Sequence, residues 1–344
     1  MKKRFTQSFI ILLYLISWPC ILSGQDLSVV YRKDTVFNNI TTLKVRGAYC
    51  KVLVTRGQDR SVRLHSLLEA DSSERCSLTT EIINRVLVVR VDIPEGKWEK
   101  YAGKLVFHVP DSVKIDVENT SGDFVINEVN AKNINVVTKT GNITVNKCDG
   151  NVIISTISGE VFTDELTGNI NVRSKSSDVN LYRIKGAVSV NTSYGNIHID
   201  DVHGNLKTAG TSGVQKIENV KGDILAKSMS GNVKISKAEG KISVLGASGD
   251  VDLFQTTGIL EIKTTKGDQT GTRINLTGDS RFISTEGKVR MRFIMPDDAL
   301  TYQLVSDNAF VFALGKSKKK KLSVGKGSIL VEAYSTTGAL SFLQ

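Results

Sequence analysis

Several residue types that mark common protein classes are rare in this sequence. Its 344 residues include four histidines, four cysteines, four prolines and two tryptophans, and aromatic residues make up 6%. So few cysteines exclude a dense disulfide scaffold, and no pair of cysteines or histidines has the spacing of a zinc site. Helical apolar periodicity is hard to find after residue 25, so a helical fold is not expected.

Long hydrophobic runs are also missing, and the clearest one lies at the N-terminus. The apolar run Phe9–Trp18 is about ten residues long, whereas a membrane-spanning helix needs about 20. Basic residues at positions 2–4 precede it and small residues at 23 and 24 follow it. This order is typical of a secretory signal peptide. We therefore predict that residues 1–24 are removed by cleavage near Gly24–Gln25.

Two alternatives for this leader are an uncleaved anchor and a lipoprotein signal that uses Cys20. Pro19 stands directly before Cys20, where lipoprotein signals resemble one another in having Gly, Ala or Ser. We favour the cleaved signal, which places the mature chain in the periplasm, on the outer-membrane surface or outside the cell.

A broad excess of one charge is missing from the mature chain. The formal net charge is +10, and loss of the three basic leader residues leaves +7. Five of those charges come from one run, which consists of Lys316, Lys318, Lys319, Lys320 and Lys321. The remainder is too nearly neutral for a nucleic-acid-binding face. The lysine run is predicted to be either a solvated loop or a contact with anionic lipid or polysaccharide.

Glycine, in contrast, recurs with a fixed period. Fourteen of fifteen positions spaced nine residues apart are glycine, and only Ser177 interrupts the series. The glycines are Gly141, Gly150, Gly159, Gly168, Gly186, Gly195, Gly204, Gly213, Gly222, Gly231, Gly240, Gly249, Gly258 and Gly267. Glycine tolerates the positive φ and the close backbone approach of a tight corner, so we predict a structural turn at each of them.

The residues after each glycine alternate between apolar and other types, as in Gly141–Val145 and Gly231–Ile235. Alternation with period two marks a short strand with one buried face. The residues before the glycines are Ser/Thr-rich in one half of the units and contain an apolar residue in the other half, so the true repeat is 18 residues. Such repeats stack by parallel pairing of each strand with its counterpart one coil away. The predicted fold is all-β, a right-handed parallel β-helix or solenoid with 18-residue coils made of two nine-residue units.

Asn or Asp often follows the glycine, as at Asn142, Asn151 and Asn196, and predicts a stacked polar ladder with a structural role in the turns. Two inward positions depart from the apolar pattern. Cys148 is predicted to be a small buried hydrophobe. Gln215 is predicted to cause a local kink without a function.

Outside the grid, alternating apolar residues predict further strands. We divide the chain into the signal peptide 1–24, an N-terminal β cap with lead-in strands at 25–118, a regular solenoid at 119–286, and C-terminal solenoid coils with a cap at 287–344. The motif Phe107-x-x-Pro110-Asp111 recurs as Phe293-x-x-Pro296-Asp297, and both copies are predicted to lead β-structure into a stretch of solenoid.

These features resemble a known group. The strand ending in Val109-Pro110-Asp111, the many Ser/Thr-x-Ser/Thr-Gly-Asn/Asp repeats and the closing Ser335-Thr336-Thr337-Gly338 are similar to adhesin-like domains of unknown function, including the head-GIN group. The resemblance covers about residues 36 to 344. It implies a right-handed β-helix on an exported protein of a Bacteroidetes-type bacterium, and it implies little about activity.

This framework carries few candidates for a functional site. Calcium-binding nonapeptide solenoids repeat an aspartate at the turn, and no such column exists here, so we expect neither a metal nor a cofactor. A carbohydrate-active site needs clustered carboxylates, and the best cluster is His198, Asp200, Asp201 and His203, with Lys216 and Glu218 one coil later. Trp98 and Tyr101 are candidate sugar contacts or packing residues of the cap. Cys50 and Cys76 could pair after export.

We therefore expect an exported noncatalytic protein of the cell envelope or surface, adhesin-like, that presents extended solenoid faces to a polysaccharide, an envelope component, a protein or another copy of itself. The outward column Thr144, Phe162, Asn180, His198, Lys216, Lys234 and Asp252 varies too much to encode a repeated ligand. The alternatives are a carbohydrate-active β-helix enzyme and a structural accessory protein of the envelope.

Overall fold

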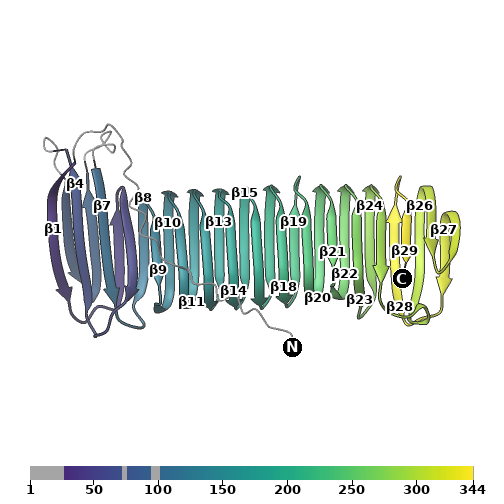
Figure 1. Cartoon of the computed structure of the whole chain (residues 1–344), viewed down its shortest axis with the longest axis horizontal. Helices are drawn as coiled ribbons and strands as arrows, with labels where there is room; N and C mark the ends of the chain where they lie inside the picture. Colours follow the sequence, from purple (N-terminus) through teal and green to yellow (C-terminus); the bar gives the residue numbers. More distant parts are fainter. Residues whose placement is uncertain (1–26, 72–75, 94–100, 344) are drawn as a thin grey trace, which may run out of the picture.

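The chain forms a long rod of stacked strands (Figure 1). The computed structural model describes residues 27–71, 76–93 and 101–343, so the predicted leader and Trp98 lie outside the described residues. Within this part the chain contains no α-helix and one short 3-10 turn, Asp297–Ala299. None of its helical segments is long and apolar enough to cross a membrane. The all-β prediction is confirmed.

The strands form two rows that face each other, so each coil has two sides. Row 1 consists of β3 (Cys50–Arg56), β9 (Phe124–Asn127), the first half of β11 (Ile143–Ser158), β12 (Val161–Thr167), β14 (Val179–Lys185), β16 (Ile197–His203), β18 (Gln215–Lys221), the first half of β20 (Val233–Ser248), β21 (Val251–Phe254), β23 (Gln269–Leu276), β25 (Val289–Phe293) and β29 (Leu340–Leu343).

Row 2 lies on the other side of the coil. It consists of β2 (Thr42–Gly47), β8 (Lys114–Ser121), β10 (Asn130–Thr140), the second half of β11, β13 (Ile170–Ser176), β15 (Val188–Tyr194), β17 (Leu206–Ser212), β19 (Ile224–Ser228), the second half of β20, β22 (Thr257–Lys266), β24 (Ser280–Glu286) and β28 (Ile329–Ser335).

Between residues 133 and 272, neighbouring strands in a row pair in parallel with the predicted offset of 18 residues. Val145 pairs with Thr163, and Ile235 pairs with Leu253. Toward the two ends of the rod the offset is 19, 20 or more. Val145, Ile235 and Leu253 are at most 3% exposed, so the alternate positions of the strands point inward as predicted. The core is therefore a single apolar stack between the rows, and the solenoid prediction is confirmed. The right-handed winding stays a prediction.

The corners are held by glycine because successive coils touch there. Gly159 has φ +115°, and a Cβ at this position would lie 2.2 Å from the carbonyl oxygen of Gly141, one coil earlier. Of the other glycines singled out as turns, Gly141, Gly150, Gly168, Gly195 and Gly249 also have positive φ, and a Cβ at Gly231 would lie 1.8 Å from the Gly213 oxygen. The nine-residue glycine period thus reflects a backbone contact between coils.

Polar side chains complete the corners. The predicted polar ladder is present, but its bonds run from coil to coil: the backbone N–H of Glu160 donates to Asn142 Oδ1, and that of Val214 donates to Asn196 Oδ1. The Ser/Thr-rich segments place an inward hydroxyl at the other side of the corner, where Thr156 Oγ1 donates to the carbonyl of Ser158. Each such bond contributes roughly 0.5–1.5 kcal/mol.

The two unusual inward residues behave differently. Cys148 is 3% exposed, which confirms its role as a small buried hydrophobe. The kink predicted at Gln215 is wrong, because this residue pairs with Ile197 and Val233 without a register shift. Its buried amide is satisfied inside the coil: Thr208 Oγ1 donates to Gln215 Oε1 at 2.6 Å, and Gln215 Nε2 donates to the Lys227 carbonyl at 2.6 Å.

At the N-terminal end each row gains one more parallel strand and then ends in antiparallel strands. Row 1 continues from β3 to β7 (Tyr101–Val109), β4 (Val62–Ala70) and β1 (Ser28–Phe37). Row 2 continues from β2 to β6 (Val86–Asp92) and β5 (Ser77–Ile83). Row 1 therefore extends one strand further than row 2 at this end.

A hairpin covers the C-terminal end. β26 (Leu300–Ala313) lies across both rows and pairs with β28 and β29, and β27 (Lys316–Gly325) pairs antiparallel with β26. The strand ladder is continuous from β2 to β28, so the domain boundaries at 118/119 and 286/287 stay predictions.

Replacement of Gly159 by alanine tests the corner contact. We expect Gly159→Ala to lower the free energy of unfolding by about 3 kcal/mol or more, because the new methyl group meets the Gly141 carbonyl in addition to the strain of positive φ. Gly315→Ala is the matched control, since Gly315 also has positive φ (+69°) but nothing within 4 Å of a Cβ. Urea unfolding that gives equal losses for the two variants would contradict the inter-coil explanation.

Candidate functional site

The structure divides the predicted carbohydrate-active cluster into two groups. β16 and β18 are adjacent in row 1, which brings His198 beside Lys216 and Asp200 beside Glu218 as the repeat predicted. Asp201 and His203 lie further along β16, where the chain approaches the corner, and their side chains pair with each other at 3.5 Å. The four residues therefore do not converge on one point.

The first group forms a zigzag row across four coils on the outer surface of row 1. This face row consists of Phe162, Tyr182, His198 and Glu218, from β12, β14, β16 and β18. The ring centroids of Phe162 and Tyr182 are 5.7 Å apart, and those of Tyr182 and His198 are 5.3 Å apart. All four side chains are partly exposed, so the row is an open platform rather than a cavity.

Hydrogen bonds fix the polar half of the face row. The Tyr182 hydroxyl lies 3.1 Å from His198 Nδ1, and His198 Nε2 lies 3.3 Å from Glu218 Oε2. Lys216 Nζ forms a short ion pair with the same Glu218 oxygen, and the Ser236 hydroxyl donates to Glu218 Oε1. An ionised Glu218 accepts, so neutral His198 carries its proton on Nε2 and accepts the Tyr182 hydroxyl proton at Nδ1.

The pKa shifts of Glu218 and Tyr182 agree with these hydrogen-bond directions. The hydrogen bond from Lys216 lowers the pKa of Glu218, with a further contribution from His198. Partial burial, reinforced by the nearby Asp200 carboxylate, raises the pKa of Tyr182. At neutral pH Glu218 is therefore ionised and Tyr182 protonated, which is the opposite of a poised general acid and an activated phenolate. The face row can present hydrogen-bonding groups and ring faces, which is binding chemistry.

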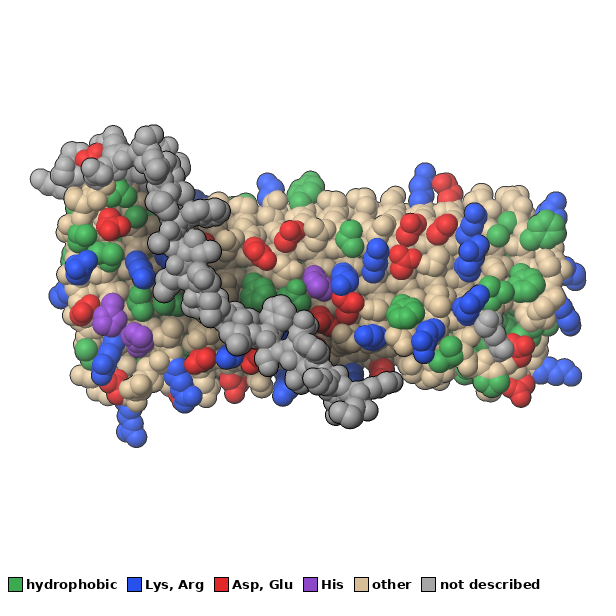
Figure 2. Space-filling model, viewed as in Figure 1, with side chains coloured by type: hydrophobic (Ala, Val, Ile, Leu, Met, Phe, Trp, Pro, Cys, Tyr) green, Lys and Arg blue, Asp and Glu red, His purple; other side chains and the backbone are tan. Residues whose placement is uncertain are grey.

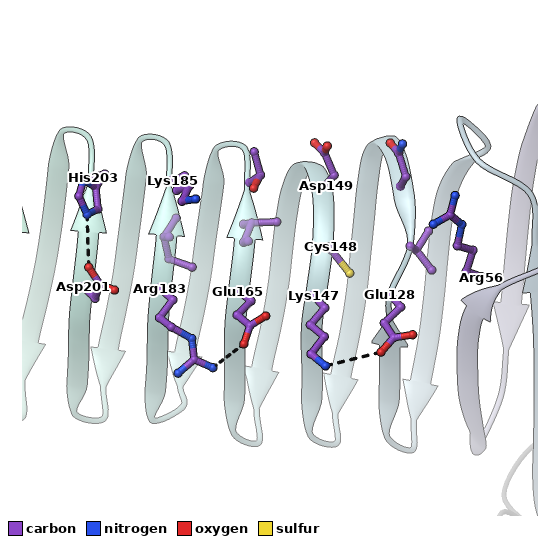
Figure 3. Close-up of a pocket in the computed structure, with 15 residues that line it drawn as sticks. Arg56, Glu128, Lys147, Cys148, Asp149, Glu165, Arg183, Lys185, Asp201 and His203 are labelled. Carbon is purple, nitrogen blue, oxygen red and sulfur yellow. Dashed lines mark hydrogen bonds and ion pairs between the residues drawn. The ribbon is translucent and has the colours of Figure 1, made fainter.

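The second group belongs to a shallow groove of about 700 Å³ along the edge of the rod. Figure 3 shows that some of its charged residues lie in one line across neighbouring coils. This edge column consists of Glu128, Lys147, Glu165, Arg183 and Asp201, whose charges alternate in sign and whose φ values are all between +50° and +58°. Left-handed residues other than glycine usually mark a special backbone position, here the bend before each corner.

Opposite charges within the edge column form ion pairs with one another. Lys147 Nζ lies 3.7 Å from Glu128 Oε1, and an Arg183 amino group lies 2.9 Å from Glu165 Oε1. Exposed pairs of this kind are each worth between 0 and about 1 kcal/mol. Because the side chains bind one another from coil to coil, the groove does not focus charge on a ligand.

The remaining predicted site residues lie at the two ends of the rod. Lys316, Lys318, Lys319, Lys320 and Lys321 lie on β27, exposed, and none of them pairs with an acidic group of the described residues. Figure 2 shows both signs of charge interspersed along the visible face, without a broad basic field. Tyr101 begins β7 and is only 8% exposed, so its side chain faces the core of the N-terminal end.

Cys50, Cys76 and Cys148 carry free thiols in the structure. Cys50 is buried in β3, where desolvation raises its pKa to about 12, and the nearby Cys76 thiol adds to the shift. Cys76 is partly exposed. Their pairing after export stays a prediction. No group of three or more metal-binding side chains occurs in the part of the chain that the structure describes.

A variant without the Lys216 ammonium tests the electrostatics of the face row. Lys216→Met is expected to raise the pKa of Glu218 toward its ordinary value of 4.5, because the largest cause of its depression is removed. In the wild type the Glu218 contribution to stability is present above pH 4.5 and is lost as the pH falls through the depressed folded-state pKa. Carboxyl-carbon NMR titration measures the shift. Lys234→Met is the control, since Lys234 is the next residue of the outward column and forms no described pair with Glu218.

The fold and these surfaces define a parallel β-solenoid with open polar faces. The chain belongs to the Toastrack DUF4097 family, whose model matches residues 77–214 and 203–332. A comparison with curated proteins gives no match.

Several solved structures are similar. A "putative adhesin" from Bacteroides fragilis is 15% identical, with 79% of this chain and 98% of that chain covered and a TM-score of 0.28. A "putative lipid binding protein" from Parabacteroides distasonis is 13% identical, with coverages of 77% and 96% and a TM-score of 0.32. A "putative cell adhesion protein" from Clostridium sporogenes is 10% identical, with coverages of 91% and 100% and a TM-score of 0.27. TM-scores this low give no information about the geometry of the site.

Proposed function

We propose that the mature chain is an exported, noncatalytic protein of the cell envelope or cell surface that binds a polysaccharide, in the manner of an adhesin. The face row is the contact site. The observation that carries the proposal is the placement of aromatic rings and hydrogen-bonding groups side by side on an open, flat strand surface. Adhesin is also the name given to the B. fragilis protein above, and that name by itself assigns no ligand.

Sugar rings have apolar C–H faces and polar edges, so they match a surface that places aromatic rings next to polar groups. In the face row, Phe162 and Tyr182 supply ring faces for stacking. Glu218 Oε1 and the Lys216 ammonium supply an acceptor and donors held in place by their neighbours. Both ring nitrogens of His198, in contrast, are already bonded to Tyr182 and Glu218. Side chains that are already fixed by hydrogen bonds lose little conformational entropy when a ligand binds, which favours affinity.

The shape of the rod favours a polymer over a small molecule. The face row crosses three strand spacings, about 14 Å, which is longer than one sugar ring. Its residues lie on rigid paired strands rather than on loops, and the surface beside it is open along the rod axis. Small-molecule sites, in contrast, are usually concave and enclose most of the ligand.

Substitution of the two rings tests this function. Phe162→Ala and Tyr182→Ala are each expected to weaken polysaccharide binding by about fivefold to tenfold, as loss of a stacking contact predicts. Tyr194→Ala is the matched control, because Tyr194 is a 54% exposed tyrosine on row 2. The measurement is a glycan-array screen of the mature protein followed by calorimetry with the best polysaccharide.

Three outcomes would contradict the proposal. Absence of binding to every polysaccharide would favour a structural accessory protein of the envelope. Equal binding by the ring variants would move the site away from the face row. Release of reducing ends from a bound polysaccharide would show a carbohydrate-active enzyme.

A further inference from the structure

The two ends of the rod differ in how they present their last strand. An unpaired edge strand offers free N–H and C=O groups to another strand, and natural proteins protect such edges with lysines, bulges and short strands. At the C-terminal end the edge is β27, which carries five exposed lysines. The lysine run is therefore placed where it opposes the addition of another chain.

At the N-terminal end of row 1 the edge is β1, a strand of ten residues. Among the described residues it pairs only with β4. Its exposed residues include Val29, Val30 and Val36, which are 50%, 40% and 57% exposed. Its exposed charged residues, Arg32, Lys33 and Asp34, differ in sign, whereas those of β27 are all lysines. β1 also extends beyond the last strand of row 2, so it can approach another chain without obstruction from β5.

We propose that β1 is a self-association site, at which two copies of this chain pair antiparallel around a two-fold axis at Lys33. In this register Arg32 faces Asp34 of the second copy, and Tyr31 faces Thr35. Because the interface is two-fold, each of these pairs occurs twice. Opposite charges and mixed aromatic and β-branched pairs stabilise antiparallel strands. Asp34 Oδ1 also lies 2.9 Å from His65 Nδ1 of its own chain, so this carboxylate would be shared between the two partners.

The neighbouring registers are less favourable. A centre at Arg32 places Arg32 opposite Arg32 and Val30 opposite Asp34, and a centre at Asp34 places two carboxylates opposite each other. With the centre at Lys33 the regular pairing ends at Tyr31 with Thr35, because Val30 lies in the bulge of β1 between Val29 and Tyr31, and Val36 of the second copy lies beside that bulge. The one unfavourable pair of this register is Lys33 with Lys33, whose long exposed side chains can diverge into solvent.

Pairing of β1 with the opposite end of a second rod is disfavoured. A head-to-tail contact would bring the lysines of β27 against Arg32 and Lys33. Like charges at such a contact are repulsive. The association therefore closes as a dimer of double length with the two lysine-bearing ends outermost, rather than continuing as a filament.

The proposed register of the dimer is tested by reversing the charges at positions 32 and 34, first singly and then together. The mature chain is studied by sedimentation velocity over a concentration series, with far-UV circular dichroism to confirm folding. Arg32→Asp and Asp34→Arg each place like charges opposite each other, so each is expected to weaken dimerisation at least tenfold. The double variant R32D/D34R restores opposite charges and is expected to recover most of the wild-type dimer.

Three further variants, one of them a control, extend the test. Lys33→Thr removes the repulsion at the centre and is expected to tighten the dimer several-fold. Val36→Lys is expected to abolish it, whereas Phe310→Lys at the other end of the rod, where Phe310 is 61% exposed, leaves it unchanged. A wild-type protein that stays monomeric at millimolar concentration would overturn the proposal, as would a double variant that fails to recover or a dimer disrupted by Phe310→Lys.

Discussion

Each coil of this protein rests on the previous one through direct backbone contact at its corners. A glycine Cα sits so close to the carbonyl of the glycine one coil earlier that no side chain fits between them. The same close approach lets an Asn or Asp oxygen receive the N–H of the next coil, and it brings the strands to hydrogen-bonding distance. The spacing of the whole rod, including the spacing of every outward side chain, follows from this contact.

Much of the fold could be predicted from the sequence because the contact recurs at a constant separation. A glycine every nine residues and apolar residues at Val145, Ile235 and Leu253 are enough to specify the parallel register. The ends could not be predicted in the same way. Pairs such as Phe37 with Val62 or Phe282 with Ala333 join segments separated by 25 and 51 residues, and no repeated spacing marks them.

The candidate site was predicted only in part, for a related reason. The repeat places His198 beside Lys216 and Glu218 one coil later, and the structure adds the contact of His198 with Glu218. Tyr182 was missed because it stands on the second outward position of its strand, so that it meets His198 diagonally, 16 residues away. Comparison of the two outward positions of adjacent coils would have found it. The kink predicted at Gln215 was wrong because the groups that satisfy its amide, Thr208 and the Lys227 carbonyl, lie in the opposite row, which the repeat does not reveal.

The alternating signs of the edge column bear on how so repetitive a chain finds its proper order. Strands of successive coils are nearly interchangeable, so a nascent chain could leave out one coil and still pair strand with strand. Such an omission would bring Glu128 against Glu165 and Lys147 against Arg183, which turns each attraction into a repulsion. Misassembly among similar units is a characteristic hazard of repeat proteins. The alternating charges of the edge column would therefore disfavour the omission of one coil, by up to about 1 kcal/mol for each pair, whereas the hydrophobic core does not discriminate between the two arrangements.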